Sequence, residues 1–309
     1  MDNKLKVKKI IELARFRFLA GGFFLYTMGA FLAVASGIDF SIELFIFGYA
    51  IMMPAHLALS YSNNYFDIEV DKKNTPVSIS GGSKVLIDYP ELISMCKYIS
   101  IILMLLSVFL ATIFVLLFSY SLVFIAFIVF GNLLGFFYTS PPLKLAYRGF
   151  GEVANMINMG LLMPGIGYWA MKGNLDLFYF VFAAAFFLYG LEFMIIVETP
   201  DMEGDIKAKK MTFVASKGRR FSYIILLCSI ITASLYFLAV GLVGIFADKI
   251  NYFIIFLLSL FPIIIAVKGF LKNPIKREIA TKIAEKNMYT LITFVILINI
   301  YLIFRNVLV

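Results

Sequence analysis

Two pairs of aspartates carry the clearest chemistry in this chain, because each pair has the spacing of one helical turn. Asp67 and Asp71 form the first pair, and Asp201 and Asp205 form the second. On a helix, side chains four residues apart point the same way and are separated by about 6 Å along the axis. Carboxylates held that close repel each other unless a cation lies between them. The two pairs therefore predict a site for divalent metal ions that binds an anionic substrate.

The first pair continues a polar stripe that begins at Asn63, since Asn63, Asp67 and Asp71 recur at every fourth residue. Oxygen ligands on one face suit Mg²⁺, which binds one or two carboxylates and completes its shell with waters and substrate phosphates. A solvated helix end that forms a turn is the alternative. The second pair argues against that alternative, because it repeats the same pattern.

The second pair has a similar stripe, in which Glu198, Asp201 and Asp205 lie at positions i, i+3 and i+7. Pro200 is expected to break or kink the helix inside this stripe, since proline lacks an amide donor. Taken alone, the segment reads as an acidic loop balanced by the lysines that follow it. Beside the first stripe, the second half of one metal site is the better interpretation.

Four basic residues near the two stripes are candidates for binding a phosphate or diphosphate group. They are Lys84, Lys144, Arg148 and Lys210. Lys144 and Arg148 follow the segment Tyr138–Pro142, where two prolines end a helix and stiffen the turn. Anchoring of the chain at a membrane surface explains each of these cations equally well when it is taken singly.

The composition is that of a helical membrane protein with many spans. Of the 309 residues, 62% are hydrophobic and only 15% are charged, with a mean hydropathy of +0.94. A soluble domain of this size does not need so much apolar surface, whereas each transmembrane helix needs about 20 apolar residues. Nine spans are predicted, at approximately residues 14–36, 41–66, 94–118, 121–138, 151–171, 177–198, 221–246, 251–271 and 287–306.

The distribution of basic residues predicts the orientation of these spans. All of the 27 Lys and Arg residues except Lys172, Lys249 and Arg305 fall before the first span or beside the loops after spans two, four, six and eight. The positive-inside bias then places the N-terminus in the cytoplasm and the C-terminus outside. Both aspartate stripes lie on the cytoplasmic side, in the long polar loops 67–93 and 199–220.

The expected architecture is all-α, with about nine transmembrane helices around a central cavity and a cytoplasmic cap of loops. We expect a single domain over residues 1–309. Four spans separate the two stripes, which suggests two four-helix halves, 14–138 and 151–271, followed by a ninth helix at 287–306.

Two ionisable residues, His56 and Glu192, are predicted to lie inside spans, where such groups are candidates for function. His56 is the only histidine, so a histidine-rich metal site is excluded. For His56 we favour a hydrogen-bonded packing role. Glu192 either lines the cavity or pairs within the bundle.

Together these residues resemble the UbiA superfamily of intramembrane prenyltransferases. The first motif of that family, Asn-Asp-x-x-Asp-x-x-x-Asp, corresponds to the segment Asn63–Asp71, with Asn64 in place of the usual aspartate. The second motif, Asp-x-x-x-Asp, corresponds to Asp201 and Asp205. Either motif alone is degenerate, but both at this spacing are fairly specific.

Other parts of the chain are also similar to this family. Lys210 and Thr212 fit its Gly-Lys-x-Thr run, with Lys209 in place of the glycine, and the segment Tyr138–Pro142 fits its Tyr-Ser-x-Pro element. Arg17 occupies the basic position that commonly opens the first helix. Further matches are Lys144, Arg148, Gly151 and Glu152. The resemblance covers nearly the whole chain.

The resemblance implies an enzyme that transfers a polyprenyl group from a prenyl diphosphate to a lipophilic acceptor. Two Mg²⁺ ions, held by Asn63 and the four aspartates, would bind the diphosphate. The residues that would contact the substrate are Asn63, Arg17, Lys84, Lys144, Arg148, Lys210 and Glu198. The allylic carbon–oxygen bond would ionise in a pocket that excludes water. Tyr138 is the candidate for stabilising the positive charge near the allylic carbon.

The resemblance leaves the acceptor open. The run from Thr75-Pro76 to Gly81-Gly82-Ser83-Lys84 is closer to the dihydroxynaphthoate-type quinone branches, so an aromatic quinone precursor is our first expectation. A glycerol-phosphate ether-lipid precursor is the alternative, and a chlorophyll- or haem-type acceptor is a further one. Besides donor and acceptor, we expect membrane lipids as partners and no nucleic acid.

A cation-coupled transporter is the alternative from a different class. Transporters place ionisable groups near the bilayer midplane, often on interrupted helices. The acidic clusters of this chain are predicted at one membrane interface, which favours an enzyme. A transferase of the CDP-alcohol phosphotransferase kind would gather its acidic residues in one Asp-Gly and Gly-x-x-x-Asp-x-x-x-Asp block, which the sequence lacks.

Overall fold

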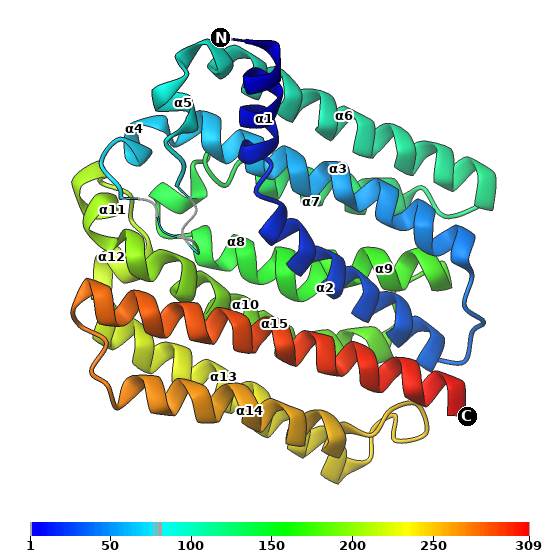
Figure 1. Cartoon of the computed structure of the whole chain (residues 1–309). Coiled ribbons are helices and arrows are strands. Elements are labelled where there is room, and N and C mark those ends of the chain that lie inside the picture. The colour runs from blue at the N-terminus through cyan, green and yellow to red at the C-terminus, as the bar shows by residue number, and fades with distance from the viewer. Residues whose placement is uncertain (1, 76, 78, 80–81, 309) are drawn as a thin grey trace.

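The computed structural model describes residues 2–75, 77, 79 and 82–308. Within these residues every regular element is helical. The long helices run side by side, and the two ends of the chain lie at opposite ends of the bundle (Figure 1). The predicted all-α architecture is confirmed.

Seven helices of the described chain are long and apolar enough to cross a membrane. They are α2 (Phe16–Ala35), α3 (Ile42–Phe66), α6 (Ile93–Phe118), α10 (Leu177–Glu198), α13 (Arg219–Val243), α14 (Tyr252–Phe270) and α15 (Arg277–Leu308). Six of them match predicted spans within a few residues. The seventh, α15, begins well before the predicted start at 287, because the polar residues 277–286 add helical turns that hydropathy alone does not reveal.

The other two predicted spans have less regular counterparts. The span predicted at 121–138 is α7 (Val123–Phe136), whose 14 residues are fewer than a 30 Å hydrocarbon core requires. The span predicted at 151–171 consists of three consecutive pieces, α8 (Gly151–Ile157), a π-helical turn η3 (Asn158–Leu162) and α9 (Met163–Lys172). The total of nine crossings therefore stays a prediction, as does the division into two four-helix halves.

Glycines let helices α2 and α9 approach each other closely. A Cβ atom added to Gly29 would lie 1.8 Å from the carbonyl oxygen of Pro164, and one added to Gly167 would lie 2.1 Å from that of Tyr26. Small residues at such crossings bring backbones together, which is a common way to gain packing energy between membrane helices. This contact fixes the wall of the bundle that carries Arg17.

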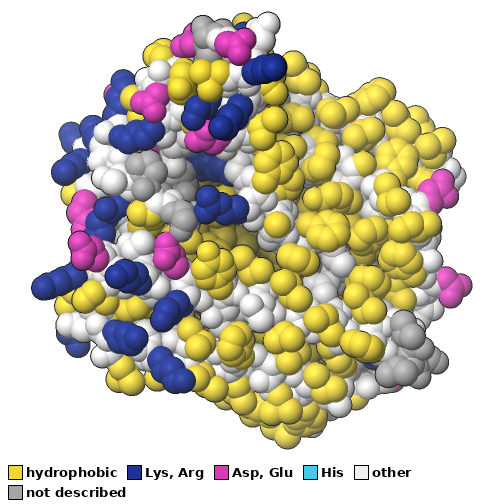
Figure 2. All heavy atoms as spheres, viewed as in Figure 1, with side chains coloured by type: hydrophobic (Ala, Val, Ile, Leu, Met, Phe, Trp, Pro, Cys, Tyr) yellow, Lys and Arg dark blue, Asp and Glu magenta, His cyan; other side chains and the backbone are white. Residues whose placement is uncertain are grey.

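The surface is divided between an apolar belt and one basic end. Large hydrophobic side chains are exposed along α6, α13 and α14, among them Leu116, Leu242 and Leu257. Figure 2 shows hydrophobic side chains covering most of the visible face, while Lys and Arg gather at the end that carries α4 and α11. Such a belt is unfavourable in water but is the normal lipid-facing surface of a membrane protein.

Short helices make up much of the polar end, where loops 67–93 and 199–220 were predicted. They are α4 (Ile68–Asp71), α5 (Val85–Asp88), η1 (Pro90–Leu92), η4 (Thr199–Asp201), α11 (Met202–Ala208) and α12 (Phe213–Lys217). A further turn, η2 (Leu145–Tyr147), follows α7. The N-terminal helix α1 (Asn3–Leu13) was not predicted, because its four lysines hide its two buried or packed residues, Ile10 and Leu13, from a hydropathy window.

Candidate active site

A cavity of about 210 Å³ lies between α2, α3, α10 and α15 and is lined by both aspartate stripes. Its apolar part is formed by side chains such as Met159, Phe186, Leu291 and Val295. Its polar part contains nine of the predicted site residues: Arg17, Asn63, Asp67, Asp71, Tyr138, Glu198, Asp201, Asp205 and Lys210. Figure 2 shows the surface hollowed beside the basic end. One cavity therefore combines a strongly charged opening with an apolar interior.

The first stripe is held on one face although the helix is interrupted. Helix α3 ends at Phe66, Asp67 is the junction, and α4 begins at Ile68. The backbone N–H of Asp71 still donates to the carbonyl of Asp67 at 2.8 Å, which preserves the helical spacing of the two carboxylates. Asn63 lies one turn earlier, and its Oδ1 accepts a hydrogen bond of 2.9 Å from Thr139 Oγ1.

Asp67 is bonded through both of its carboxylate oxygens. Tyr147 donates its hydroxyl to Oδ1 at 2.6 Å, and Lys210 Nζ lies 2.9 Å from Oδ2. Burial alone would lower the pKa of the Lys210 ammonium, but the carboxylates of Asp67 and Asp205 hold this pKa well above its usual value. Lys210 is therefore a permanent cation between the two stripes.

Asp71 accepts one backbone hydrogen bond, from the N–H of Ser83 to Oδ2 at 3.1 Å. Burial raises the pKa of the Asp71 carboxyl to about 6, and the Ser83 bond and the Arg15 charge offset this rise only in part. A carboxylate in this state gains from a further cation close by.

The second stripe follows a broken helix, as the position of Pro200 predicts. Helix α10 ends at Glu198, and the turn η4 leads into α11. Asp201 is 8% exposed, and its Oδ1 has no hydrogen-bond partner among the described residues. Asp205 accepts a bond of 3.1 Å from Thr212 Oγ1. A buried carboxylate oxygen without a partner is costly, so this position suits a cation.

Glu198 has a partly structural role. Its Oε2 accepts the backbone N–H of Val214 at 3.3 Å, while Glu152 Oε1 accepts that of Phe213 at 2.6 Å. The two glutamates thus cap the N-terminus of α12, where amide donors are otherwise unpaired. Within the described part of the chain, the Oε1 of Glu198 is left without a partner in the wall of the cavity.

The oxygen ligands that line the cavity fit Mg²⁺. The carboxylates of Asp67, Asp71, Asp201 and Asp205 line the cavity with the amide of Asn63, and the lining also includes Glu198, Asn74 and Asn155. Such oxygen ligands are the hard donors that Mg²⁺ prefers. No group of three or more His, Cys, Asp or Glu side chains within the described residues is close enough to hold a metal ion alone. Mg²⁺ does not require such a group, because it commonly binds one or two carboxylates and completes its coordination with water and phosphate.

Three of the predicted substrate-binding residues do not line the cavity. Lys84 Nζ donates to the carbonyl of Lys72 at 3.4 Å, and Arg148 donates to that of Pro142 at 3.0 Å. Lys144 is exposed, with its ammonium 5.3 Å from the centre of the Tyr147 ring. Their distance from the cavity matches the surface-anchor alternative, and their contact with a substrate stays a prediction.

Sequence reasoning missed several polar residues of the site. Arg15 lines the cavity and donates to Asn64 Oδ1 at 2.6 Å, and Asn64 Nδ2 donates to the carbonyl of Leu13 at 3.1 Å. The asparagine that departs from the family motif therefore fastens the start of α2. Asn74 and Tyr147 were missed as well. Only the run Asn63–Asn74, dense in oxygen donors, hinted at Asn74, and nothing local points from Tyr147 to Asp67.

The two ionisable residues inside spans differ in their surroundings. His56 lines the cavity, and its Nδ1 has no hydrogen-bond partner among the described residues. The structure therefore does not show, at that atom, the hydrogen bond that the predicted packing role requires. Glu192 is 1% exposed and is not among the residues that line the cavity, and its Oε2 has no hydrogen-bond partner within the described residues. Glu192 therefore belongs to the packed bundle.

Comparison with known proteins agrees with the fold and the motifs. The sequence profile of the UbiA prenyltransferase family matches residues 23–291. A UbiA homologue from Archaeoglobus fulgidus bound to GPP and Mg²⁺ has 16% identity and a TM-score of 0.69, with 96% of this chain and 99% of that chain covered. A UbiA homologue from Aeropyrum pernix K1 has 14% identity and a TM-score of 0.69, with coverages of 92% and 97%.

A third solved structure, of a digeranylgeranylglyceryl phosphate synthase, has 18% identity and a TM-score of 0.65, with coverages of 96% and 99%. At these identities the likeness of the structures establishes the fold. No curated protein sequence matches the chain. The family profile covers most of the chain, and it decides between an enzyme and a transporter. The chain is a multi-pass membrane protein that belongs to the UbiA prenyltransferase family.

Proposed function

We propose that this prenyltransferase transfers a polyprenyl group from a prenyl diphosphate, with Mg²⁺, to an aromatic quinone precursor. The observation that carries the proposal is the single cavity in which Asp67, Asp71, Asp201 and Asp205 meet an apolar interior. The charged mouth suits a diphosphate, and the interior suits a prenyl chain. The Archaeoglobus fulgidus homologue has been solved with DMAPP and Mg²⁺ and with GPP and Mg²⁺, which are ligands of the same class.

The four aspartates and Asn63 would hold two Mg²⁺ ions. When bound, these ions supply positive charge that stabilises the diphosphate as it leaves. Lys210, already charged beside Asp67, is placed to bind a phosphoryl oxygen once Asp67 turns to a metal ligand. Arg17 at the cavity wall adds a second cation for the same group.

The remaining residues would orient the donor and exclude water. Tyr138 lines the cavity on the Lys210 side, so its ring can face the positive charge that develops on the allylic carbon. Phe186, Met159 and Leu291 would surround the chain and keep bulk water from the cation. The acceptor then attacks the allylic carbon, forms the new bond and loses a proton to the departing diphosphate.

An aromatic acceptor is supported by the rings in the cavity wall. Phe18, Phe193 and Tyr189 line it together with Tyr138, and such rings stack on a flat acceptor. The sequence run Thr75–Lys84 supports the same class by resemblance. Of that run, residues 76, 78, 80 and 81 lie outside the described residues, so its comparison rests on sequence.

A glycerol-phosphate ether-lipid precursor is the second candidate. Three basic side chains, Arg15, Arg17 and Lys210, line one cavity, which is enough charge for a second phosphate besides the diphosphate. The likeness to the digeranylgeranylglyceryl phosphate synthase structure points the same way.

An acceptor screen separates these candidates. Purified protein in lipid nanodiscs is given a radiolabelled prenyl diphosphate, Mg²⁺ and one acceptor at a time: a dihydroxynaphthoate, or a glycerol phosphate carrying one ether chain. Label transferred to the aromatic compound, with diphosphate released in equal amount, supports the proposal. Label found only in the glycerol-phosphate product would replace the acceptor, and no diphosphate release with either would refute prenyl transfer.

We also propose that the cavity mouth faces the cytoplasm, in a cell membrane, with the C-terminus outside. One support is the gathering of Lys and Arg at the end that carries α4 and α11 (Figure 2). The other is that only Lys172, Lys249 and Arg305 fall in the opposite segments of the sequence. Reporter fusions at each terminus test this. A C-terminal reporter that is active only in the cytoplasm would contradict the orientation.

A further inference from the structure

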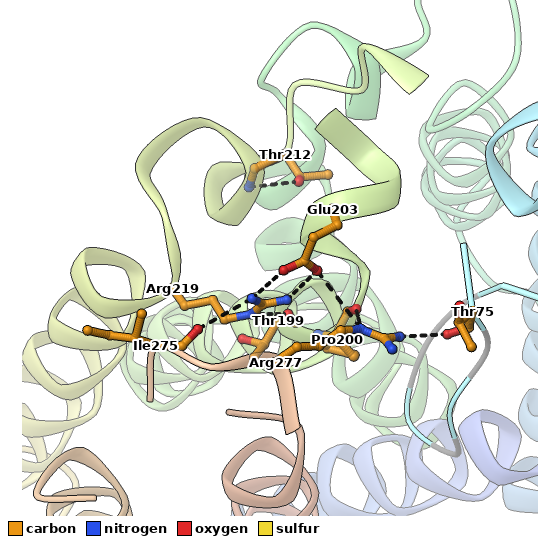
Figure 3. A network of polar contacts seen from close by, with 9 residues as sticks. Thr75, Thr199, Pro200, Glu203, Thr212, Arg219, Ile275 and Arg277 are labelled. Carbon is orange, nitrogen blue, oxygen red and sulfur yellow. Dashed lines mark hydrogen bonds and ion pairs between the residues drawn. The ribbon is translucent and has the colours of Figure 1, made fainter. Parts of the chain in front are cut away.

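The broken helix end at Pro200 exposes backbone carbonyls that two arginines cover. Arg219 Nε donates to the carbonyl of Thr199 at 2.8 Å, and Arg277 Nε donates to that of Pro200 at 2.9 Å (Figure 3). Carbonyls at a helix C-terminus lack helical partners and carry partial negative charge, so guanidinium groups stabilise them well. The turn that leads to Asp201 is therefore fixed from outside the cavity.

Glu203 completes this arrangement with a two-pronged ion pair. Arg219 Nη1 lies 2.6 Å from Glu203 Oε1, and Arg219 Nη2 lies 2.5 Å from Glu203 Oε2. The side chain of Arg219 is only 4% exposed, so its charge depends on protein partners for compensation, whereas Glu203 is 45% exposed. Parallel pairing of this kind fixes direction as well as distance. Glu203 lies between Asp201 and Asp205 in the sequence, so the pair sets the rotation of α11.

Arg277 also connects the second stripe to the segment behind the first. Its Nη2 donates to the carbonyl of Thr75 at 2.8 Å, across 202 residues of chain. In Figure 3, Arg277 lies between Pro200 on one side and Thr75 on the other. The neighbouring Asn74 packs directly on α11, since a Cβ atom at Gly204 would lie 1.5 Å from Asn74 Oδ1. The segments that follow the two stripes are thus cross-linked at this place.

All three charged residues of this network lie outside the cavity wall. Their effect on a substrate would therefore pass through the aspartates. Mg²⁺ requires nearly ideal octahedral geometry, and a displacement of about 1 Å at a reacting centre can cost about 100-fold in rate. The separation of the two stripes, which come from spans far apart in the chain, must accordingly be held within a narrow range.

We propose that Glu203, Arg219 and Arg277 are positioning residues, which hold the second stripe at the distance from the first that lets both stripes share the diphosphate-bound metal ions. Arg277 is the member that joins the two stripes. This inference rests on the proposed function, because it takes the aspartates as metal ligands.

The test compares Arg277→Gln with Arg277→Lys and with Arg220→Gln, which removes an exposed charge beside Arg219 outside the network. Two quantities are measured: the Mg²⁺ concentration for half-maximal turnover, and Mn²⁺ binding to the donor-free protein by electron paramagnetic resonance. We expect Arg277→Gln to raise the Mg²⁺ concentration for half-maximal turnover and to weaken Mn²⁺ binding, each by about 10-fold or more. Losses of this size are usual when residues that support metal ligands are removed. Arg277→Lys should recover part of the loss, and Arg220→Gln should match the parent protein.

The unfolding temperature of the metal-free protein separates positioning from general stabilisation. An unchanged Mg²⁺ requirement in Arg277→Gln, with or without a lowered unfolding temperature, would overturn the proposal. If Arg277→Gln does not fold, Glu203→Gln is used, since that side chain is 45% exposed, and the same increase in the Mg²⁺ requirement is expected. Asp201→Asn serves as the reference. If it too leaves metal binding unchanged, the proposed function fails, whereas an effect in Asp201→Asn alone defeats only the positioning role.

Discussion

Lys210 and Asp67 form an ion pair of 2.9 Å at the polar end of the cavity, although 143 residues separate them in the chain. The pair connects the two aspartate stripes, because Asp67 belongs to the first stripe and Lys210 follows the second. The side chains are 11% and 12% exposed, so the pair is shielded from water and from salt. It joins the two motifs across the site and supplies a fixed positive charge there.

Replacing Lys210 should therefore affect the donor more than the fold. We expect Lys210→Gln to lower kcat/KM for the prenyl diphosphate by about 100-fold, the loss typical of one electrostatic contact to developing charge. Lys210→Arg should retain much of the activity, since it keeps the charge. Steady-state kinetics against Lys209→Gln, an exposed neighbour at the end of α11, provide the comparison. Equal loss in both glutamine variants would contradict a specific role.

Removing one carboxylate from either stripe should stop turnover without unfolding the protein. Asp67→Ala and Asp201→Ala, or the closer Asp67→Asn and Asp201→Asn, are expected to lower kcat by about 100-fold or more, because each stripe loses a metal ligand. Glu69→Gln is the matched control, since Glu69 is exposed and pairs with Lys72 outside the site. Activity near that of the parent protein in both aspartate variants would refute the metal assignment.

Metal removal should act on activity and on stability together. A chelator is expected to abolish turnover, and added Mg²⁺ should restore it. With inorganic diphosphate present, Mg²⁺ should also raise the unfolding temperature, since a ligand at 100 times its Kd stabilises the folded state by about 2.7 kcal/mol. Scanning fluorimetry measures this shift, which Asp201→Asn should lose. A shift that persists in Asp201→Asn would place the binding elsewhere.

The contact of α2 with α9 predicts that replacement by alanine destabilises the protein far more at Gly29 than at Gly21, although both lie in α2. Gly29→Ala would place a methyl group 1.8 Å from the carbonyl oxygen of Pro164, so the helices must separate. We expect a loss of about 1–3 kcal/mol in unfolding free energy, as for other overpacked sites. Gly21→Ala meets nothing within 4 Å and should leave the unfolding temperature unchanged or slightly higher. Similar unfolding temperatures in the two variants would disprove the close crossing.

Local patterns in the sequence predict the membrane architecture and both halves of the site. Apolar runs such as 177–198 predict α10 with the observed bounds, because every membrane helix must satisfy its backbone internally and so needs an apolar run of set length. The aspartate stripes are equally local, since spacing along one helix decides which carboxylates share a face. Where the apolar run is short or broken, at α7 and at the π-turn η3, the prediction is weakest.

By itself, the sequence determined an all-helical membrane protein, two acidic stripes and the family to which they belong. Only the tertiary structure decided which cations join them. Lys144 and Arg148 look as suitable as Lys210 along the chain, yet of these three it is Lys210 that reaches Asp67. The links from Tyr147 to Asp67 and from Arg277 to Thr75 span 80 and 202 residues. Such contacts depend on how whole helices pack, and no spacing within one helix encodes that packing.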